Sequence, residues 1–477
     1  MHLPQENGVK PAAWANMANL QLFSIKPMRD LTQGSITKHI IAMAIPISIG
    51  MLVQTLYFFV DLYFVAGLGD AALAGVSSAG ILQFAVMALT QTLSVGAVSL
   101  ISHAVGRKDQ ADANHIFNQL LLLSGLCALV TLIGGYGLAK SYMHLLAADT
   151  ATINAGISFI QYLLPGLALQ FVMTGAGSGL RGTGIVKPTM LVQLLTVLLN
   201  LILAPVLIAG WGTGYAMGVA GAGLATSIAC LGGTLASLYY FKKLETYVKL
   251  DRQQLAFDAS ICKRILGVGL PAGGEFFFIF IFMAVLYGII RDFGASAQAG
   301  FGLGTRLMQA IFLPVMAISF AIAPIAGQNF GAKLSARVRE TVRSATILVC
   351  TLMAVLTLLC QISPGWLVHF FTQDPEVSSV ASEYLRIISW NFVASGFIFA
   401  CSGTFQALGN TWPSFISMGS RVITFALPAL WLSHQSGFKI IHVWYLSVAT
   451  VTLQALISLF LLRHEMNKQL KKITGSC

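Results

Sequence analysis

The two halves of this chain repeat one pattern of helix-breaking residues at a constant offset of 225 positions. The pairs are Pro46 with Pro271, Gly69 with Gly294, Gly106 with Gly331, Gly184 with Gly409, and Pro188 with Pro413. Apolar runs long enough to cross a bilayer separate these breakers. Such a duplication predicts two matching bundles of spanning helices, an arrangement typical of secondary transporters that bind substrate between the repeats.

The composition is that of an integral membrane protein. Mean hydropathy is +0.78, and charged residues make up 9% of the chain, against about 25% in soluble domains. We expect an all-α fold of about twelve transmembrane helices in two pseudo-symmetric six-helix lobes, because the long apolar runs do not alternate as β-barrel strands do. The predicted spans are 39–66, 74–104, 116–138, 151–176, 187–210, 218–241, 264–290, 297–327, 344–362, 379–407, 414–433 and 440–462.

These spans divide the chain into five parts. We predict an N-terminal arm at 1–37, an N-lobe at 38–241, a linker at 242–263, a C-lobe at 264–463 and a C-terminal tail at 464–477. The arm has no apolar core of a signal peptide, so we expect no cleavage and disorder up to about Leu31. The polar linker is expected to form a short surface helix.

The net charge of +11 is distributed asymmetrically. One side of the predicted topology holds 22 of the 28 Lys and Arg residues, including Arg181 in the loop predicted between spans 151–176 and 187–210. The opposite loops hold Lys140, Arg291 and Lys439. This bias predicts that both termini are cytoplasmic, in a protein of the cell inner membrane, and that the charges face anionic lipid headgroups rather than nucleic acid.

No pattern for a metal, a cofactor or ATP is present. The seven cysteines form no CxxC pair, and the nine histidines show no ligand spacing. A phosphate-binding Walker A loop is also absent from the sequence. A membrane-embedded enzyme would need a nucleophile, a metal or an acid–base pair, and none is apparent.

Two acids, Asp61 and Glu275, lie well inside predicted spans. A charge at mid-bilayer costs about 2.5–3.5 kcal/mol, so such residues usually face a cavity and act in transport. Asp61 shares one helical face with Gln54, Tyr57 and Phe58, which are therefore candidates to line a cleft. The alternative for either acid is hydrogen bonding for packing alone.

Three further residues complete the candidate site. Pro46 precedes Asp61 by 15 residues, and a proline inside a helix forms either a hinge or a static kink. Asn200 is a buried amide that requires partners, and Thr226 offers a hydroxyl in the middle of the sixth span. If the first, fifth and sixth spans pack together, Asp61 and Asn200 share one network.

Five segments resemble the multidrug and toxic compound extrusion (MATE) family, part of a superfamily that includes oligosaccharidyl-lipid and polysaccharide flippases. They are PISIGMLVQTLYFFVDLYFVAGLGDAALAG, LRGTGIVKP, NLILAP, GVAGAGLATS and PIAGQNFGAK. The resemblance covers about residues 38–465. It implies an antiporter that exports amphipathic or cationic compounds through a cleft alternately open to either side.

The resemblance also assigns roles to residues of the candidate site. It implies that Asp61 couples transport to an ion, with Asn200 and Thr226 beside it, and that Glu275 is a second proton or cation site. One departure is Ala204, which stands where the family's N-x-x-L-D-P motif has a carboxylate. Because a Na⁺ site loses a charged ligand by this change, H⁺ is the favoured coupling ion, with Na⁺ the alternative.

A lipid-linked oligosaccharide flippase of the same superfamily is the nearest rival function. It would be expected to place more cations in the cleft, whereas the predicted spans, apart from the terminal Lys187 and Arg264, contain only Arg306, Arg386 and Arg421. We expect a monomer, because each chain holds both lobes.

Overall fold

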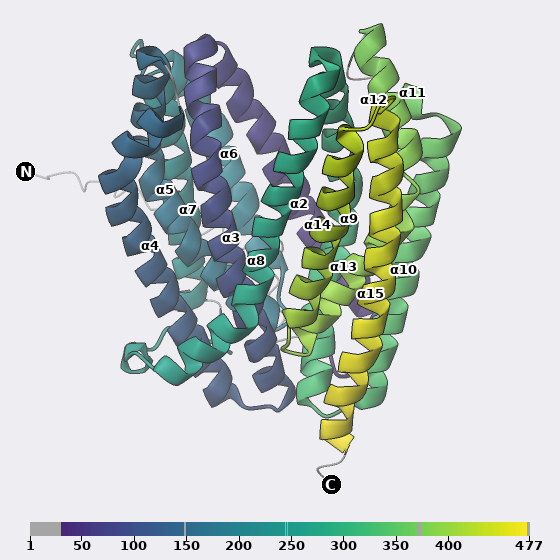
Figure 1. The fold of residues 1–477 in the computed structure, drawn as a ribbon. Coiled ribbons are helices and arrows are strands. Elements are labelled where there is room, and N and C mark those ends of the chain that lie inside the picture. The colour runs from purple at the N-terminus through teal and green to yellow at the C-terminus, as the bar shows by residue number, and fades with distance from the viewer. Residues whose placement is uncertain are drawn as a thin grey trace, which may run out of the picture.

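The structure, a computed structural model, describes residues 30–146, 149–243, 245, 247–369, 372 and 374–474, with the side chains of 57–62, 252 and 474 excepted. Its long helices stand as two bundles side by side (Figure 1). The first bundle, the N-lobe, contains α2 (Ile36–Ala66), α3 (Asp70–Gly106), α4 (Gln110–Leu146), α5 (Thr150–Gly182), α6 (Lys187–Ala209) and α7 (Val219–Lys243). The predicted disorder at the start of the chain falls on residues 1–29, outside the described ranges.

The second bundle, the C-lobe, repeats this order. It contains α8 (Ala259–Ile290), α9 (Ala295–Gly331), α10 (Ser335–Ile362), the short α11 (Pro364–His369), α12 (Pro375–Ile388), α13 (Asn391–Ala407), α14 (Trp412–Ser433) and α15 (Ile440–Thr474), with the 3₁₀ turn η4 (Arg291–Phe293) after α8. Within the described residues, eleven helices are long and apolar enough to span a membrane, or twelve if α12 and α13 count as one span. The all-α, two-lobe fold expected from the sequence is confirmed.

The repeat extends to the turn conformations. Gly69 and Gly294 have φ of 103° and 92°, and Lys108 and Lys333 both have φ of 60°. Positive φ is uncommon for residues other than glycine. Its recurrence at equivalent positions shows that the same chain path is used twice.

The predicted tenth span, 379–407, is wrong as one continuous helix. α12 and α13 are separate helices that meet at a bend of 59°. Side chains of α10 satisfy the carbonyls released there: Gln361 Nε2 donates to Arg386 O at 2.6 Å, and Thr357 Oγ1 donates to Ser389 O at 3.0 Å. Neighbouring side chains that donate hydrogen bonds to the freed carbonyls allow a helix to break inside a membrane.

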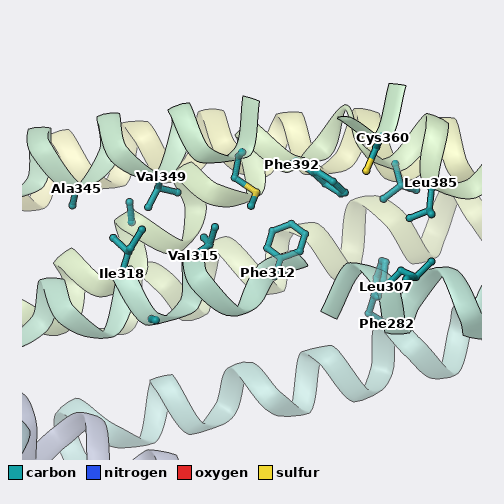
Figure 2. Packing of buried hydrophobic residues seen from close by; sticks show 14 of the residues in the cluster. Phe282, Leu307, Phe312, Val315, Ile318, Ala345, Val349, Cys360, Leu385 and Phe392 are labelled. Carbon is teal, nitrogen blue, oxygen red and sulfur yellow. The ribbon is translucent and has the colours of Figure 1, made fainter. Parts of the chain in front are cut away.

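Each lobe has its own hydrophobic core, and the first helix of each lobe contributes to both cores. The start of α2, including Ile36 and Ile40, is buried in the C-lobe core, part of which Figure 2 shows. The start of α8, including Ile261 and Ile265, is buried in the N-lobe core. In Figure 1, α8 runs obliquely from one bundle to the other. The lobes are therefore joined by α2 and α8, each of which begins in the core of the opposite lobe, as well as by the linker. We call these two the crossed helices.

The linker follows an ordered path across α4 and differs in detail from the prediction. Between α7 and α8, the described part of the linker contains the 3₁₀ turn η3 (Arg252–Leu255), and its last residues, from Ala259 on, already belong to α8. Asn118 donates to Lys249 O at 3.0 Å and accepts from Asp251 N at 2.9 Å. Gln119 donates to Ala256 O at 2.6 Å and accepts from Asp258 N at 3.0 Å. Amides on α4 thus replace the hydrogen bonds that a longer helix would supply.

The backbones of the two lobes approach each other closely where α3 and α9 end. A Cβ atom at Gly106 would collide with Gln328 O, and one at Gly331 would collide with His103 O. Gln328 also donates to Gly182 O on α5 at 3.2 Å and accepts from Leu31 N at 3.1 Å. Glycine at both positions permits this backbone approach. The lobes are sealed at this end of the bundle.

The predicted C-terminal tail continues the last spanning helix. α15 extends to Thr474, past the predicted end of the span at residue 462. Glu465 in this extension accepts from Asn410 Nδ2 at 2.9 Å, and Leu470 is buried. These contacts explain why a polar segment remains helical.

Candidate functional site

A cavity of about 350 Å³ opens among the helices of the N-lobe. α2, α3, α5, α6 and α7 supply most of its wall, and Phe276 of α8 with Met316 and Phe320 of α9 complete it from the C-lobe. The cavity therefore lies where the two repeats face each other, the place that the duplication predicts for a substrate site.

Amide and thioether side chains dominate the polar and flexible part of this wall. The glutamines are Gln54, Gln83, Gln91, Gln170 and Gln193, and the methionines are Met51, Met87, Met173, Met190 and Met316. Methionine adapts its shape to different ligands, and an amide both donates and accepts hydrogen bonds. This combination suits ligands of varied shape.

Asn200 and Thr226 meet in the wall of the cavity. Asn200 Nδ2 donates to Thr226 Oγ1 at 3.2 Å, and Thr226 Oγ1 donates to Ala222 O at 3.2 Å. α6 and α7 approach closely because Gly221 leaves room for Leu207 O, where a Cβ would collide. Gly221 thus has a packing role, and the close approach of α6 and α7 brings these two polar groups together.

The first helix carries the other candidate residues. Pro46 lies inside α2 and lines the cavity. Gln54 also lines it and accepts from Gln193 Nε2 at 3.2 Å, which ties α2 to α6. The backbone of Asp61, Tyr57 and Phe58 belongs to α2, but their side chains lie outside the described part of the chain.

Glu275 is placed apart from this group. It lies on α8 and interacts with Ser414 of α14, and it is not among the residues that line the cavity. Ser414 in turn donates to Ser402 Oγ of α13 at 3.0 Å. The structure therefore gives Glu275 a polar environment within the C-lobe and does not join it to Asn200 and Thr226.

Ala204 is fully buried one helical turn after Asn200. Residues four apart share a face of a helix, so a carboxylate here would lie on the same side of α6 as Asn200. The departure from the N-x-x-L-D-P motif thus removes a negative charge from the interior near the cavity wall.

Arg181 is the functional candidate that sequence reasoning missed, because it was assigned to a loop. It instead occupies the last turn of α5, lines the cavity and donates through Nη2 to Ser94 Oγ at 2.5 Å. Its guanidinium lies 5.8 Å from the centre of the Phe320 ring. An available signal was the position of LRGTG at the end of an uninterrupted apolar span.

The MatE family model matches residues 46–206 and again 271–432, once in each lobe. The chain belongs to the MatE family. The start points, 46 and 271, reproduce the offset of the repeat. MatE members are membrane transporters, so this chain is a transporter and not an enzyme.

Individual relatives of this MatE protein are distant but match along most of their length. The probable multidrug resistance protein YoeA of Bacillus subtilis is 24% identical, over 79% of this chain and 82% of its own. The multidrug export protein MepA of Staphylococcus haemolyticus is also 24% identical, with 91% and 95% covered. An FAD transporter of Shewanella oneidensis is 24% identical, with 87% and 92% covered.

Solved structures show the same fold. A MATE protein in the bent conformation superposes with a TM-score of 0.87 at 24% identity, with 93% of this chain and 98% of that chain covered. An outward-facing multidrug resistance MATE transporter gives a TM-score of 0.86 at 24% identity, with 93% and 99% covered.

Proposed function

We propose that this MatE protein exports amphipathic organic compounds, cationic ones included, across the cell inner membrane in exchange for protons. The observation that carries this proposal is the cavity of about 350 Å³ between the repeats. It lies above a sealed end of the lobes and has a wall of methionine and glutamine. The multidrug export of relatives such as MepA supports the same substrate class.

Alternating access follows from the way the lobes are joined. In this structure the lobes meet where α3 and α9 end. With both termini in the cytoplasm, this seal is cytoplasmic and the cavity is directed outward. Rocking the lobes about the crossed helices α2 and α8 would open the seal and close the opposite end, in a monomer that holds both halves.

Asp61 is the proposed coupling residue. Facing outward, it takes a proton, which rearranges α2 around Pro46 and weakens substrate binding. After the lobes rock, the proton leaves to the cytoplasm and a new substrate enters. Exchange requires that proton and substrate binding oppose each other. The buried Ala204 in place of a carboxylate favours H⁺ over Na⁺.

The test is ethidium movement in proteoliposomes under an imposed pH gradient or an imposed Na⁺ gradient. Uphill transport driven by the pH gradient alone supports the proposal. Transport driven by Na⁺ alone would overturn the assignment of the coupling ion. Movement under neither gradient would contradict the proposal and favour lipid-linked oligosaccharides as substrates.

A further inference from the structure

We propose that Arg181 is an anion-binding group within the cavity, and that it selects amphipathic substrates bearing a carboxylate. This inference rests on the proposed export function and refines its substrate class: the compound carries an acidic group in addition to its apolar body. Its basis is the environment of one guanidinium.

The hydrogen bonds of Arg181 use only part of its capacity. Nη2 donates to Ser94 Oγ at 2.5 Å and to Ser178 Oγ at 3.2 Å. Nε exposes less than 1 Å² to solvent and has no hydrogen-bond partner. A guanidinium carries five N–H donors, so the described contacts hold it in place while leaving donors for a ligand.

Among the side chains that the structure describes, no carboxylate forms an ion pair with Arg181. The ion pairs of the described residues are Arg107 with Asp112 and His115 with Asp258, and neither includes it. Its nearest groups are serine hydroxyls and the face of Phe320. An enclosed cation with neutral partners is costly, and an anionic ligand would offset that cost.

The cavity determines where an anionic ligand would meet Arg181, because Arg181 is part of its wall. Among the described side chains of its wall, Arg181 alone is charged. The remaining wall has the size and apolar character of a small-molecule site. A bound compound would place its acidic group at Arg181 and its body against the methionines. Arginine is well suited to carboxylates, because its planar donors match the two carboxylate oxygens.

Arg421 provides a matched control within the same chain. It lies in the C-lobe with its guanidinium 4.6 Å from the centre of the Phe282 ring, and its Nε also has no hydrogen-bond partner. Unlike Arg181, it does not line the cavity. Loss of Arg421 therefore removes an enclosed positive charge without changing the proposed anion site.

The experiment measures binding by fluorescence polarisation with the purified full-length protein in detergent. The probes are a rhodamine dye with a free carboxylate and the methyl ester of the same dye. Arg181→Gln is expected to weaken binding of the acid about tenfold, the usual effect of losing a hydrogen bond to a charged group, and to leave the ester unchanged. Arg421→Gln should leave both dyes unchanged.

Arg181→Lys keeps the positive charge but loses the planar donor arrangement of arginine, so it separates the two contributions to binding. It also provides a test if the glutamine variant does not fold. It should bind the acid with an affinity between those of wild type and the glutamine variant, with the ester unaffected. Equal weakening of both dyes by substitution of Arg181, failure of wild type to bind the acid, or the same selective loss in Arg421→Gln would each overturn the inference.

Transport of the same dyes distinguishes this inference from the proposed function. If proteoliposomes move the ester under a pH gradient but Arg181→Gln leaves binding of the acid unchanged, the export function stands and the anion site is wrong. Proteoliposomes that move neither dye contradict the export function on which the inference rests.

Discussion

His103 and Gln328 occupy equivalent positions in the two repeats, 225 residues apart, and each binds a helix-end carbonyl of the opposite lobe. His103 Nε2 lies 2.6 Å from Ala407 O, and Gln328 Nε2 donates to Gly182 O at 3.2 Å. Ala407 and Gly182 are themselves 225 residues apart and end α13 and α5. These two hydrogen bonds form a symmetric lock at the sealed end of the lobes.

Breaking the lock should favour the conformation in which the sealed end opens. Each hydrogen bond contributes about 1 kcal/mol, so His103→Ala or Gln328→Ala should change the ratio of conformations about fivefold, and the double variant should change it further. Distances between spin labels placed in the turns at 68 and 293 report the closing of the opposite end.

Gln253→Ala serves as the control for the lock, because this amide is exposed and lies in the linker turn η3. A distance distribution that is identical in the wild type and the double variant would show that the two hydrogen bonds do not hold the seal.

Asp61→Asn should abolish export driven by a pH gradient while the protein still inserts and folds. Asparagine preserves the shape of the side chain but cannot release a proton, so the coupling step is lost. Ethidium transport in proteoliposomes measures the effect. Asp70→Asn, at the exposed start of α3, should transport normally; full uphill export by the Asp61 variant would remove the proposed role of this residue.

Ala204→Asp should make transport sensitive to Na⁺. The new carboxylate would lie on the buried face of α6 near Asn200 and supply a charged oxygen ligand. Ala204→Asn is the matched control, because it adds similar volume without charge. If a folded Ala204→Asp protein responds to Na⁺ as the wild type does, the missing carboxylate does not determine the choice of ion.

Asn118→Ala should destabilise the protein by about 1–3 kcal/mol, since it removes two hydrogen bonds between the buried Asn118 amide and the backbone of the linker. Asn118 is fully buried and both donates to Lys249 O and accepts from Asp251 N. Unfolding by titration with sodium dodecyl sulfate measures the loss. A midpoint equal to that of the exposed-site variant Gln253→Ala would show that the amide does not secure the linker.

The fold was largely predictable because its signals are local. The length of each apolar run and the spacing of its breakers specify spanning helices without reference to the rest of the chain. The repeat offset then gives the two-lobe arrangement. The tenth span failed because its break depends on Thr357 and Gln361, which belong to a different helix.

The candidate site was predictable only in part. Asn200 and Thr226 were found because polar groups inside apolar spans are rare, and the structure brings them together. Arg181 was missed because a difference of one helical turn determines whether an arginine at a helix end reaches solvent or points into the bundle. Arg181 points inward, where it donates a hydrogen bond to Ser94 on another helix.

By itself, the sequence determined that this chain crosses the membrane repeatedly and that its two halves share one pattern of spanning helices. Both properties depend on hydrophobic length and helix breakers, which act over neighbouring residues. Only the tertiary structure decided which ends of the lobes meet, which residues line the cavity and which charge is enclosed. Those outcomes depend on contacts between residues such as His103 and Ala407, 304 positions apart, and no local pattern encodes such contacts.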